Sequence, residues 1–278
     1  MSPHRMKTVC RICAGRRVFP SAAPMVYDGK ADGSAVFGDN KGPRLYNLIM
    51  NIFGIQKLTL LDFPGAVACT IFTGGCNLRC PFCHNASLVL GTAEGGTPES
   101  EVLAFLSKRN TLLDGICVSG GEPLMHPDLP EFLRKAKALN YRIKLDTNGC
   151  FPDALRDIVS RGLVDYVAMD IKNAPERYAE TVGVPGFDLS PVRESIAFLL
   201  SSAVDYEFRT TVVRGLHTRE SLQGAAQSIE GAERYYLQKF VDSGDLVGEN
   251  LSAFSDAEMQ SFLPAVSPYV KTAKLRGL

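Results

Sequence analysis

The stretch Ala66-Val-Ala-Cys-Thr-Ile-Phe72 runs directly into Thr73-Gly-Gly-Cys76-Asn-Leu-Arg-Cys80-Pro-Phe-Cys83. Its first part is a continuous apolar run, which is typical of a strand buried in a parallel sheet. Its second part is a loop with three cysteines that leaves this strand at its C-terminal end. Because parallel α/β barrels carry their active sites at the carboxyl ends of their strands, the stretch predicts both the fold class and the position of the site.

The three cysteines, Cys76, Cys80 and Cys83, are separated by three and then two residues, so successive turns of backbone can bring their sulfurs to a common point. Thiolates are the soft ligands that iron-sulfur clusters select. A closed cluster takes four protein thiolates, whereas three leave one iron with an open position. As with zinc sites, a missing protein ligand indicates chemistry rather than a structural role.

A zinc knuckle with His84 as the fourth ligand is the alternative interpretation of these cysteines. Two observations weigh against it, because His84 adjoins Cys83 and no second Cys/His pair with zinc spacing follows downstream. A further pair, Cys10 and Cys13, is half of a zinc site without its other half.

Cys76-x3-Cys80-x2-Cys83, with Phe82 before the last cysteine, resembles the cluster motif of radical S-adenosylmethionine (SAM) enzymes. The resemblance implies a 4Fe-4S cluster whose open iron is chelated by SAM. The following His84 and Asn85 are similar to the glycyl-radical-enzyme activases, especially the anaerobic ribonucleoside-triphosphate reductase activating proteins. This resemblance extends from about residue 51 to the C-terminus.

Composition limits the partners of this chain of 278 residues, of which 45% are hydrophobic. Thirty acidic residues balance 30 basic ones, so no overall field recruits nucleic acid or an anionic membrane. No apolar run has the length of a membrane span, and the basic start lacks the apolar stretch of a secretory signal. Eight cysteines, three of them at cluster spacing, fit a reducing compartment, and we expect a cytoplasmic protein.

Residues 1–49 differ in character from residues 50–278. Up to residue 41 they mix Arg, Ser, Pro, Gly and Asp without sustained periodicity, which predicts a poorly ordered N-terminal extension. The segment from Met50 resembles the start of family members, so we expect residues 1–49 to be a translation-start artefact, with a genuine appendage as the alternative. We expect residues 50–278 to form one radical SAM domain.

Apolar strand patterns alternate with amphipathic helix patterns from residue 51 onward. Candidate strands cover residues 66–72, 115–118, 141–145, 166–171, 206–213 and 235–240. Candidate helices cover residues 98–109, 128–139, 152–161, 191–201, 218–229 and 256–265, the last leading to residues 270–275. Such alternation predicts βαβ units and a parallel sheet. It matches the incomplete, TIM-like (β/α)6 barrel of the family that the sequence resembles.

The second candidate strand ends in Ser119, Gly120, Gly121 and Glu122. Glycines let the backbone approach a ligand, and a carboxylate beside them can hold an ammonium group. The resemblance implies that Gly120, Gly121 and Glu122 receive the SAM amino group, whereas an ordinary βα turn is the alternative.

The third and fourth strands also end in polar residues. Asp146, Thr147 and Asn148 suit ribose hydroxyls, although Asn-Gly is also a common turn. The resemblance places them beside the SAM ribose and carboxylate. It also assigns Asp170 and Lys172 to the SAM and substrate neighbourhood, where Lys172 neutralises a carboxylate; a solvent-facing salt bridge is the alternative.

The fifth and sixth strands contribute Arg209, a candidate for the SAM carboxylate, and Gln238, a candidate for the adenine edge. His217, in a later loop, lies where family members place a histidine near SAM. Simple strand-end polarity is the alternative for Arg209 and Gln238, and a lone loop histidine such as His217 is more often simply solvated. We assign no role to the remaining cysteines of the domain, Cys69, Cys117 and Cys150.

Taken with the resemblance, the sequence predicts a radical SAM activase with a catalytic cluster (Cys76, Cys80, Cys83) and Lys172. It would cleave SAM reductively and abstract a hydrogen from a glycine of a partner, an enzyme of the anaerobic ribonucleotide reductase or pyruvate formate-lyase type. The expected electron donor is a flavodoxin or ferredoxin. Two alternatives stay open, namely a radical SAM enzyme with a small-molecule substrate and a zinc-binding module without enzymatic activity.

Overall fold

The computed structural model describes residues 35–39, 42–46 and 50–278, and the chain divides into two compact units, Met1–Leu48 and Ile49–Leu278. In the first unit, β1 (Ala35–Asp39) pairs antiparallel with β2 (Gly42–Tyr46). No strand was expected there, because both runs contain Gly together with Asp or Pro, residues that are depleted in strands. The Cys10 and Cys13 pair lies outside the described residues, and the poorly ordered extension stays a prediction.

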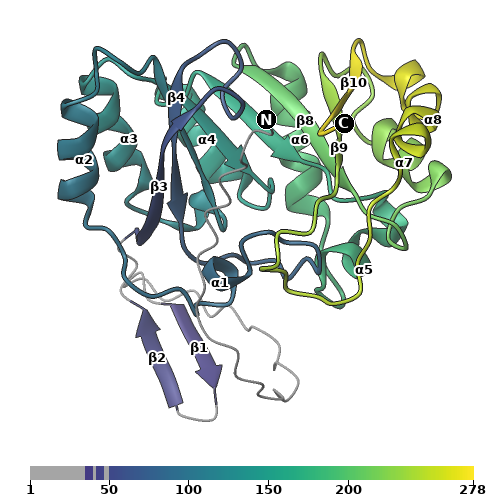
Figure 1. Ribbon diagram of the computed structural model, residues 1–278, viewed down its shortest axis with the longest axis horizontal. Coiled ribbons are helices and arrows are strands. Elements are labelled where there is room, and N and C mark those ends of the chain that lie inside the picture. The colour runs from purple at the N-terminus through teal and green to yellow at the C-terminus, as the bar shows by residue number, and fades with distance from the viewer. Residues whose placement is uncertain (1–34, 40–41, 47–49) are drawn as a thin grey trace, which may run out of the picture. The chain divides into compact units, whose positions relative to one another are not determined.

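The second unit is built on a sheet of eight strands in the order β10-β9-β8-β7-β6-β5-β4-β3. Its six central strands are parallel, which confirms the predicted α/β class (Figure 1). They are β4 (Ala68–Thr73), β5 (Gly115–Gly120), β6 (Arg142–Thr147), β7 (Tyr166–Asp170), β8 (Asp205–Val212) and β9 (Tyr235–Lys239). Each lies within two residues of the bounds expected from the apolar runs.

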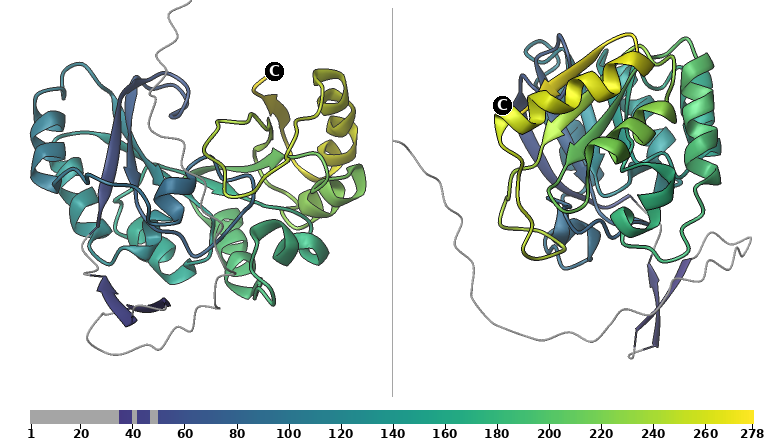
Figure 2. Two further views of the ribbon diagram at one scale, coloured as in Figure 1. Left: turned by 60° about the horizontal axis from the view of Figure 1, so that its bottom comes forward. Right: turned by 90° about the vertical axis from the view of Figure 1, so that its right-hand side faces the viewer.

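Helices connect these strands and pack on the outer face of the curved sheet (Figures 1 and 2). The predicted ones are α2 (Glu99–Ser107), α3 (Leu129–Ala138), α4 (Pro152–Ser160), α6 (Ser190–Ser201), α7 (Arg219–Gln227) and α8 (Asp256–Val266). Local sequence sets where they begin: Thr218 and Ser255 form capping boxes, and Pro152 opens α4. Two short helices, α1 (Ala86–Val89) and α5 (Tyr178–Val182), were not predicted.

Two further strands extend the sheet beyond the six that were expected. β3 (Ile52–Thr59) pairs antiparallel with β4, and β10 (Ala273–Arg276) pairs in parallel with β9. They lie at opposite ends of the strand order and do not pair with each other, so the barrel stays incomplete. Because β3 is an edge strand with a mixed burial pattern, it lacks the continuous apolar run that identifies the central strands.

The interior of the barrel changes from apolar to polar along the strands. At the amino ends a small cluster closes the floor, made of Phe63, Ala66, Ala68, Tyr166 and Ala168. At the carboxyl ends the inward side chains are charged or polar, as described below. The amino ends of the strands therefore enclose apolar side chains, whereas the carboxyl ends carry polar and charged ones.

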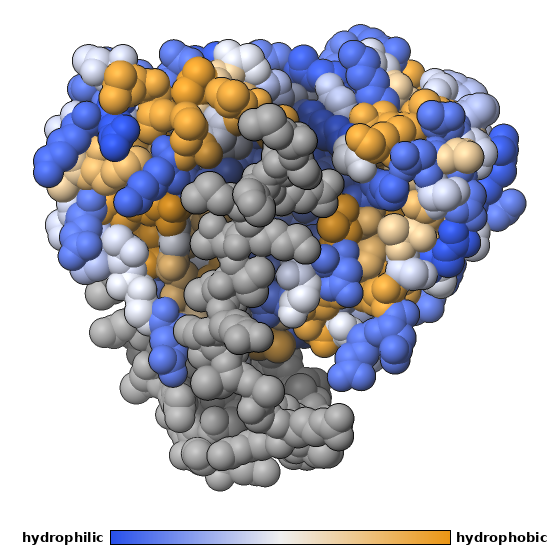
Figure 3. All heavy atoms as spheres, viewed as in Figure 1, coloured by the Kyte–Doolittle hydropathy of each residue, from blue (hydrophilic) through white to orange (hydrophobic). Residues whose placement is uncertain are grey.

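Apolar side chains also gather outside the core, at the turn that joins β3 to β4. Leu58, Leu60 and Leu61 are 58%, 69% and 88% exposed, and Figure 3 shows the apolar surface along the upper edge of that view. Among the described residues, no helix is long and apolar enough to cross a membrane.

Candidate functional site

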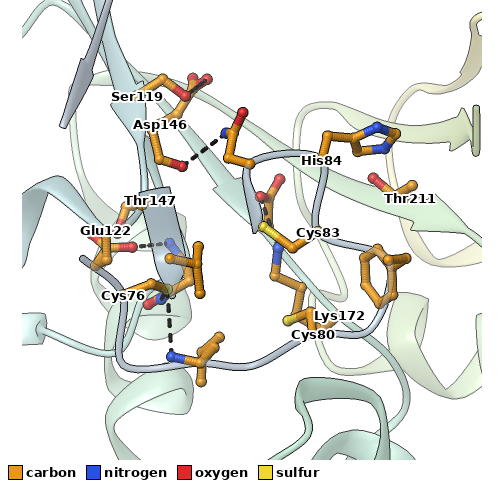
Figure 4. Close-up of a pocket in the computed structure, with 18 of the residues that line it drawn as sticks. Cys76, Cys80, Cys83, His84, Ser119, Glu122, Asp146, Thr147, Lys172 and Thr211 are labelled. Atoms are coloured by element: carbon orange, nitrogen blue, oxygen red, sulfur yellow. Dashed lines mark hydrogen bonds and ion pairs between the residues drawn. The ribbon is translucent and has the colours of Figure 1, made fainter. Parts of the chain in front are cut away.

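A pocket opens at the carboxyl ends of the strands and has about 770 Å³ of empty space, including space open to solvent (Figure 4). The structure brings all but two of the predicted site residues to its wall: Cys76, Cys80, Phe82, Cys83, Gly120, Gly121, Glu122, Asp146, Thr147, Asn148, Asp170, Lys172 and Arg209. The strand ends therefore converge as the sequence predicts.

The cysteine loop is shaped by its own backbone before any ligand is considered. The guanidinium of Arg79 donates to the carbonyl oxygens of Cys76 and Leu78, at 2.7 and 2.8 Å. The N–H of Cys83 donates to the carbonyl of Cys80 at 3.1 Å. These bonds turn the three cysteines toward the same pocket, and Figure 4 shows their sulfurs along its lower edge and centre.

The donor set fits a multi-iron cluster better than a single ion. Within the described residues, no three His, Cys, Asp or Glu side chains are placed to hold one metal ion. Three thiols spaced around a pocket suit a larger object that each of them touches at a different iron. Burial raises the pKa of Cys76 to about 12 and that of Cys80 to about 11, so a bound cluster must displace their protons.

The Gly-Gly-Glu loop packs directly on the cysteine loop. The N–H groups of Gly121 and Glu122 donate to the carbonyls of Thr73 and Gly75, at 2.9 and 2.8 Å. A β-carbon built on Gly121 would lie 1.7 Å from the carbonyl oxygen of Gly75, so no other residue fits there without moving backbone. The close approach that we predicted for a ligand is made, in this structure, by the neighbouring loop.

Glu122 is 1% exposed and has three donors from the chain itself. Its carboxylate accepts from the N–H of Asn148 at 2.7 Å, from the hydroxyl of Thr147 at 2.8 Å and from the N–H of Leu124 at 3.1 Å. Burial raises the pKa of Glu122 to about 7, against these hydrogen bonds. The carboxylate thus joins the ends of two strands and also lies at the pocket wall.

A chain of ion pairs runs through the barrel beneath the pocket. Arg209 bonds Asp170 through Nε at 2.9 Å and approaches Asp146 at 3.4 Å. Lys172 bonds the second oxygen of Asp170 at 3.0 Å, and Lys144 bonds Asp146. Lys144 is 1% exposed, a burial that lysine tolerates only when it is paired.

The pairing holds these groups in their charged forms. Burial disfavours an ionised Asp146, but Arg209 and Lys144 outweigh it and lower its pKa to about 2. Burial likewise disfavours charge on Lys172, yet Asp170 outweighs it and raises the pKa of Lys172 above its ordinary value. The pocket is therefore lined by fixed charges at neutral pH.

His217 and Gln238 are the two predicted residues that the structure does not bring to the pocket wall. His217 is 2% exposed, and both ring nitrogens are used by backbone. Nδ1 accepts from the N–H of Val213 at 3.1 Å, which leaves Nε2 to donate to the carbonyl of Lys172 at 2.8 Å. His217 therefore supports the strand end that carries Lys172.

Four other residues lie at the pocket wall without a role in SAM binding having been predicted for them, namely His84, Asn85, Ser119 and Thr211. Asn85 ties the two loops together by donating to the carbonyl of Gly120 at 3.1 Å. Ser119 donates to Asp146 at 3.0 Å. Short polar side chains of this kind carry no pattern of their own and are recognised only when the fold gathers them.

The segment after β9, residues 240–252, also reaches the cysteine loop. Gly248 donates to the carbonyl of Pro81 at 2.7 Å, and Asp245 accepts from the hydroxyl of Ser87 at 3.0 Å. Phe240 packs against His84 with ring centroids 5.6 Å apart. No sequence signal indicated these contacts, because they join residues about 160 positions apart.

An open parallel α/β barrel that turns three thiols and a set of fixed charges into one pocket defines a class of cofactor-dependent enzymes. The sequence profile of the Radical SAM superfamily matches residues 70–226, and the chain belongs to this superfamily. Membership implies a 4Fe-4S cluster and SAM. The thiols and the charged groups of the pocket fit both, so the single-ion zinc hypothesis is set aside.

The curated relatives include proteins named as activating enzymes and proteins named as synthases. A Methanocaldococcus jannaschii protein named only as a candidate glycyl-radical enzyme activating enzyme is 29% identical over 82% of this chain and 96% of its own length. A pyruvate formate-lyase-activating enzyme of Listeria monocytogenes is 30% identical over 46% of this chain and 55% of its own. A 7-carboxy-7-deazaguanine synthase of Hyperthermus butylicus is 29% identical over 63% and 69%.

Solved structures support the fold alone. Streptococcus suis SuiB, bound to precursor peptide SuiA, aligns with a TM-score of 0.57 and 13% identity over 73% of this chain. The chain spans about half of SuiB, 47% of its length. TYW1 with a lysine-pyruvate adduct aligns with a TM-score of 0.50 and 12% identity over 73% of this chain and 74% of TYW1.

Proposed function

We propose that this protein is a glycyl-radical-enzyme activating enzyme. The observation that carries the proposal is the near full-length match to the Methanocaldococcus jannaschii protein of that name, which covers 82% of this chain and 96% of that relative. The sequence Cys83-His84-Asn85 supports it independently. When bound, cluster and SAM would together supply a reductively generated radical that removes a hydrogen atom from a glycine.

The chain's own residues would bind the cluster and SAM and hold them next to each other. Cys76, Cys80 and Cys83 would provide the three thiolate ligands, which leaves one iron free for a ligand that is not protein. Phe82 lies between the last two cysteines in the sequence, and the Nζ of Lys172 lies over its ring, 6.0 Å from the centroid. The charge of Lys172, which follows β7, is therefore close to the cysteine loop.

Charged groups at the strand ends would orient SAM. Lys172 lines the pocket and keeps its charge, which suits it to a carboxylate. Asp146, Thr147, Asp170 and Arg209 complete the same wall, although each also binds a neighbour within the chain. Gly120, Gly121 and Glu122 would offer backbone and a carboxylate to the amino group.

The partner is proposed to be an anaerobic ribonucleotide reductase or an enzyme of the pyruvate formate-lyase type, with electrons from a flavodoxin or ferredoxin in the cytoplasm. The balanced net charge of the chain favours a docking determined by local shape over general electrostatic capture. Neither a nucleic acid nor a membrane is among the proposed partners.

Electron paramagnetic resonance tests the proposal. Protein with a reconstituted cluster is mixed anaerobically with SAM, a reductant and a co-encoded glycyl radical enzyme, and a glycyl radical doublet is expected in the partner. Replacing the target glycine of the partner by alanine should remove the doublet. SAM cleavage without a doublet from any co-encoded glycyl radical enzyme would contradict the proposal.

A radical SAM enzyme with a small-molecule substrate is the second candidate, favoured by the match to the Hyperthermus butylicus synthase over 63% of this chain. It shares the cluster and SAM residues with the first. Multiple turnovers of a small molecule without a partner protein would establish it.

A further inference from the structure

The side-chain amide of Asn148 lies between the end of β6 and the cysteine loop. Asn148 is 6% exposed, and its Nδ2 is 2.8 Å from Oδ1 of Asn77 and 3.8 Å from the sulfur of Cys76. Its Oδ1 accepts from the backbone N–H of Cys150 at 2.9 Å. A backbone N–H can only donate, so this bond fixes which amide atom is oxygen and turns the nitrogen toward Cys76.

The three cysteines differ in the hydrogen bonds that their sulfurs receive. The sulfur of Cys76 accepts from the N–H of Leu78 at 3.4 Å as well as from Asn148. Within residues 50–278, the sulfurs of Cys80 and Cys83 accept no hydrogen bond from another residue. One ligand of the proposed cluster is thus set apart from the other two.

The position of the donor is set by the fold and not by a ligand. The backbone N–H of Asn148 donates to the buried carboxylate of Glu122 at 2.7 Å, and Thr147 donates to the same group at 2.8 Å. Glu122 is in turn bonded to the cysteine loop through its own N–H, which is 2.8 Å from the carbonyl of Gly75. The amide therefore faces Cys76 before any cofactor binds.

We infer that the Asn148 amide adjusts the reduction potential of the cluster through its N–H···S hydrogen bond to Cys76. The inference rests on the proposed cluster site and deepens it. Reduction adds negative charge to a cluster and its thiolates, and an N–H donor at a sulfur stabilises the reduced form more than the oxidised form. Hydrogen bonds to sulfur are among the factors that set cluster potentials.

The test measures the midpoint potential of the cluster-loaded protein, without SAM or partner, by a redox titration followed by electron paramagnetic resonance. Asn148→Leu has a similar shape and no donor. It should lower the equilibrium constant for one-electron reduction about tenfold, which is about 59 mV more negative. Asn148→Ala removes the donor without adding a charge, so it should shift the potential in the same direction.

Asn85→Leu is the matched control, because Asn85 lines the same pocket but donates to the carbonyl of Gly120 and not to a sulfur. Its potential should stay within about twofold of wild type in equilibrium constant, or about 18 mV. If Asn148→Leu does not retain the cluster, Asn148→Ala decides the question. A wild-type potential in a cluster-loaded Asn148 variant, or an equal shift in Asn85→Leu, overturns the inference.

The outcome is independent of the partner. A shifted potential in the Asn148 variants, together with no glycyl radical in any partner, supports this inference while contradicting the proposed function. A wild-type protein that assembles no cluster contradicts both.

Discussion

Arg209 lies between Asp170 and Asp146, with Nε 2.9 Å from the carboxylate of Asp170 and Nη1 3.4 Å from that of Asp146. Lys144 and Lys172 bond the outer sides of the same two carboxylates. Three cations thus face two anions in this chain of ion pairs, which leaves one positive charge in excess. Of the two lysines only Lys172 lines the pocket, where its charge favours a ligand with a carboxylate.

Lys172→Met should weaken SAM binding. The substitution removes the cation that lies over the Phe82 ring at the pocket wall, while Arg209 still pairs with Asp170, so the strand end keeps its structure. We expect the dissociation constant for SAM to rise roughly tenfold to a hundredfold, the size of a lost hydrogen bond between charged groups. Equilibrium dialysis with the cluster-loaded protein measures it. Lys137→Met, which breaks a pair with Asp165, is the control; equal affinities in both variants would disprove the assignment.

Replacing Cys76, Cys80 or Cys83 singly by alanine should abolish the iron-sulfur absorbance and SAM cleavage, because two thiolates cannot hold the proposed cluster. Cys150→Ala removes a half-buried thiol that packs on the same core but is not at the pocket wall, and should leave both intact. Iron and sulfide content after anaerobic reconstitution measures the first effect. Normal cluster content in any of the three variants would exclude that cysteine as a ligand.

Glu122 should make stability depend on pH. Burial raises its pKa from 4.5 to about 7. A group whose pKa is raised by folding binds its proton more tightly in the folded state. Its contribution is fully present below about pH 4.5 and is lost as pH rises through about 7, by about 3 kcal/mol in total.

Glu122→Gln does not titrate and isolates this effect from that of other groups. The free energy of unfolding of wild type should fall relative to the variant by about 3 kcal/mol between about pH 5 and about pH 8. Denaturant titrations at several pH values measure the difference. Parallel curves for the two proteins would show that Glu122 is ionised throughout.

Arg276 should be needed for stability although it lies near the C-terminus. It holds Glu207, whose side chain is fully buried, through two hydrogen bonds of 2.5 and 2.7 Å. Arg276→Met leaves that carboxylate with only the hydroxyl of Tyr166, so we expect a loss of about 3 kcal/mol in the free energy of unfolding. Thermal or denaturant unfolding measures it.

A second substitution and a surface pair serve as controls for that prediction. Glu207→Gln in the Arg276→Met background removes the unpaired charge and should recover part of the loss. Lys271→Met breaks an exposed pair with Glu233 and should change the free energy of unfolding far less than Arg276→Met does. Equal effects of Arg276→Met and Lys271→Met would contradict a special role for the buried pair.

Most of the fold could be predicted from the sequence. The central strands are buried on both faces, so their sequences are nearly continuous apolar runs, as in Ala68–Thr73. The edge strand Ile52–Thr59 could not be predicted, since half-buried positions alternate weakly. The strand Ala273–Arg276 could not be predicted either, because none of its residues is buried and its ion pair, Arg276 with Glu207, joins residues far apart in the sequence.

The site was predictable where residues follow strands, since carboxyl ends of parallel strands meet at one edge. What their side chains do there was not predictable. Glu122 and Asn148 were expected to face a ligand, and the structure shows them bonded to each other through oxygen and backbone nitrogen. His217 was expected near SAM, but its ring is used by backbone groups of Val213 and Lys172. Such pairings depend on distances between strands, which a sequence pattern does not contain.

Gly121 rests so closely on Gly75 that the two loops behave as a single part. For protein engineering this makes them a unit of exchange. A cysteine loop grafted from a related enzyme would bring its own backbone path, and the resident Gly-Gly-Glu loop would then clash with it or lose its hydrogen bonds. Chimeras that exchange residues 73–85 should therefore include residues 119–123 from the same donor.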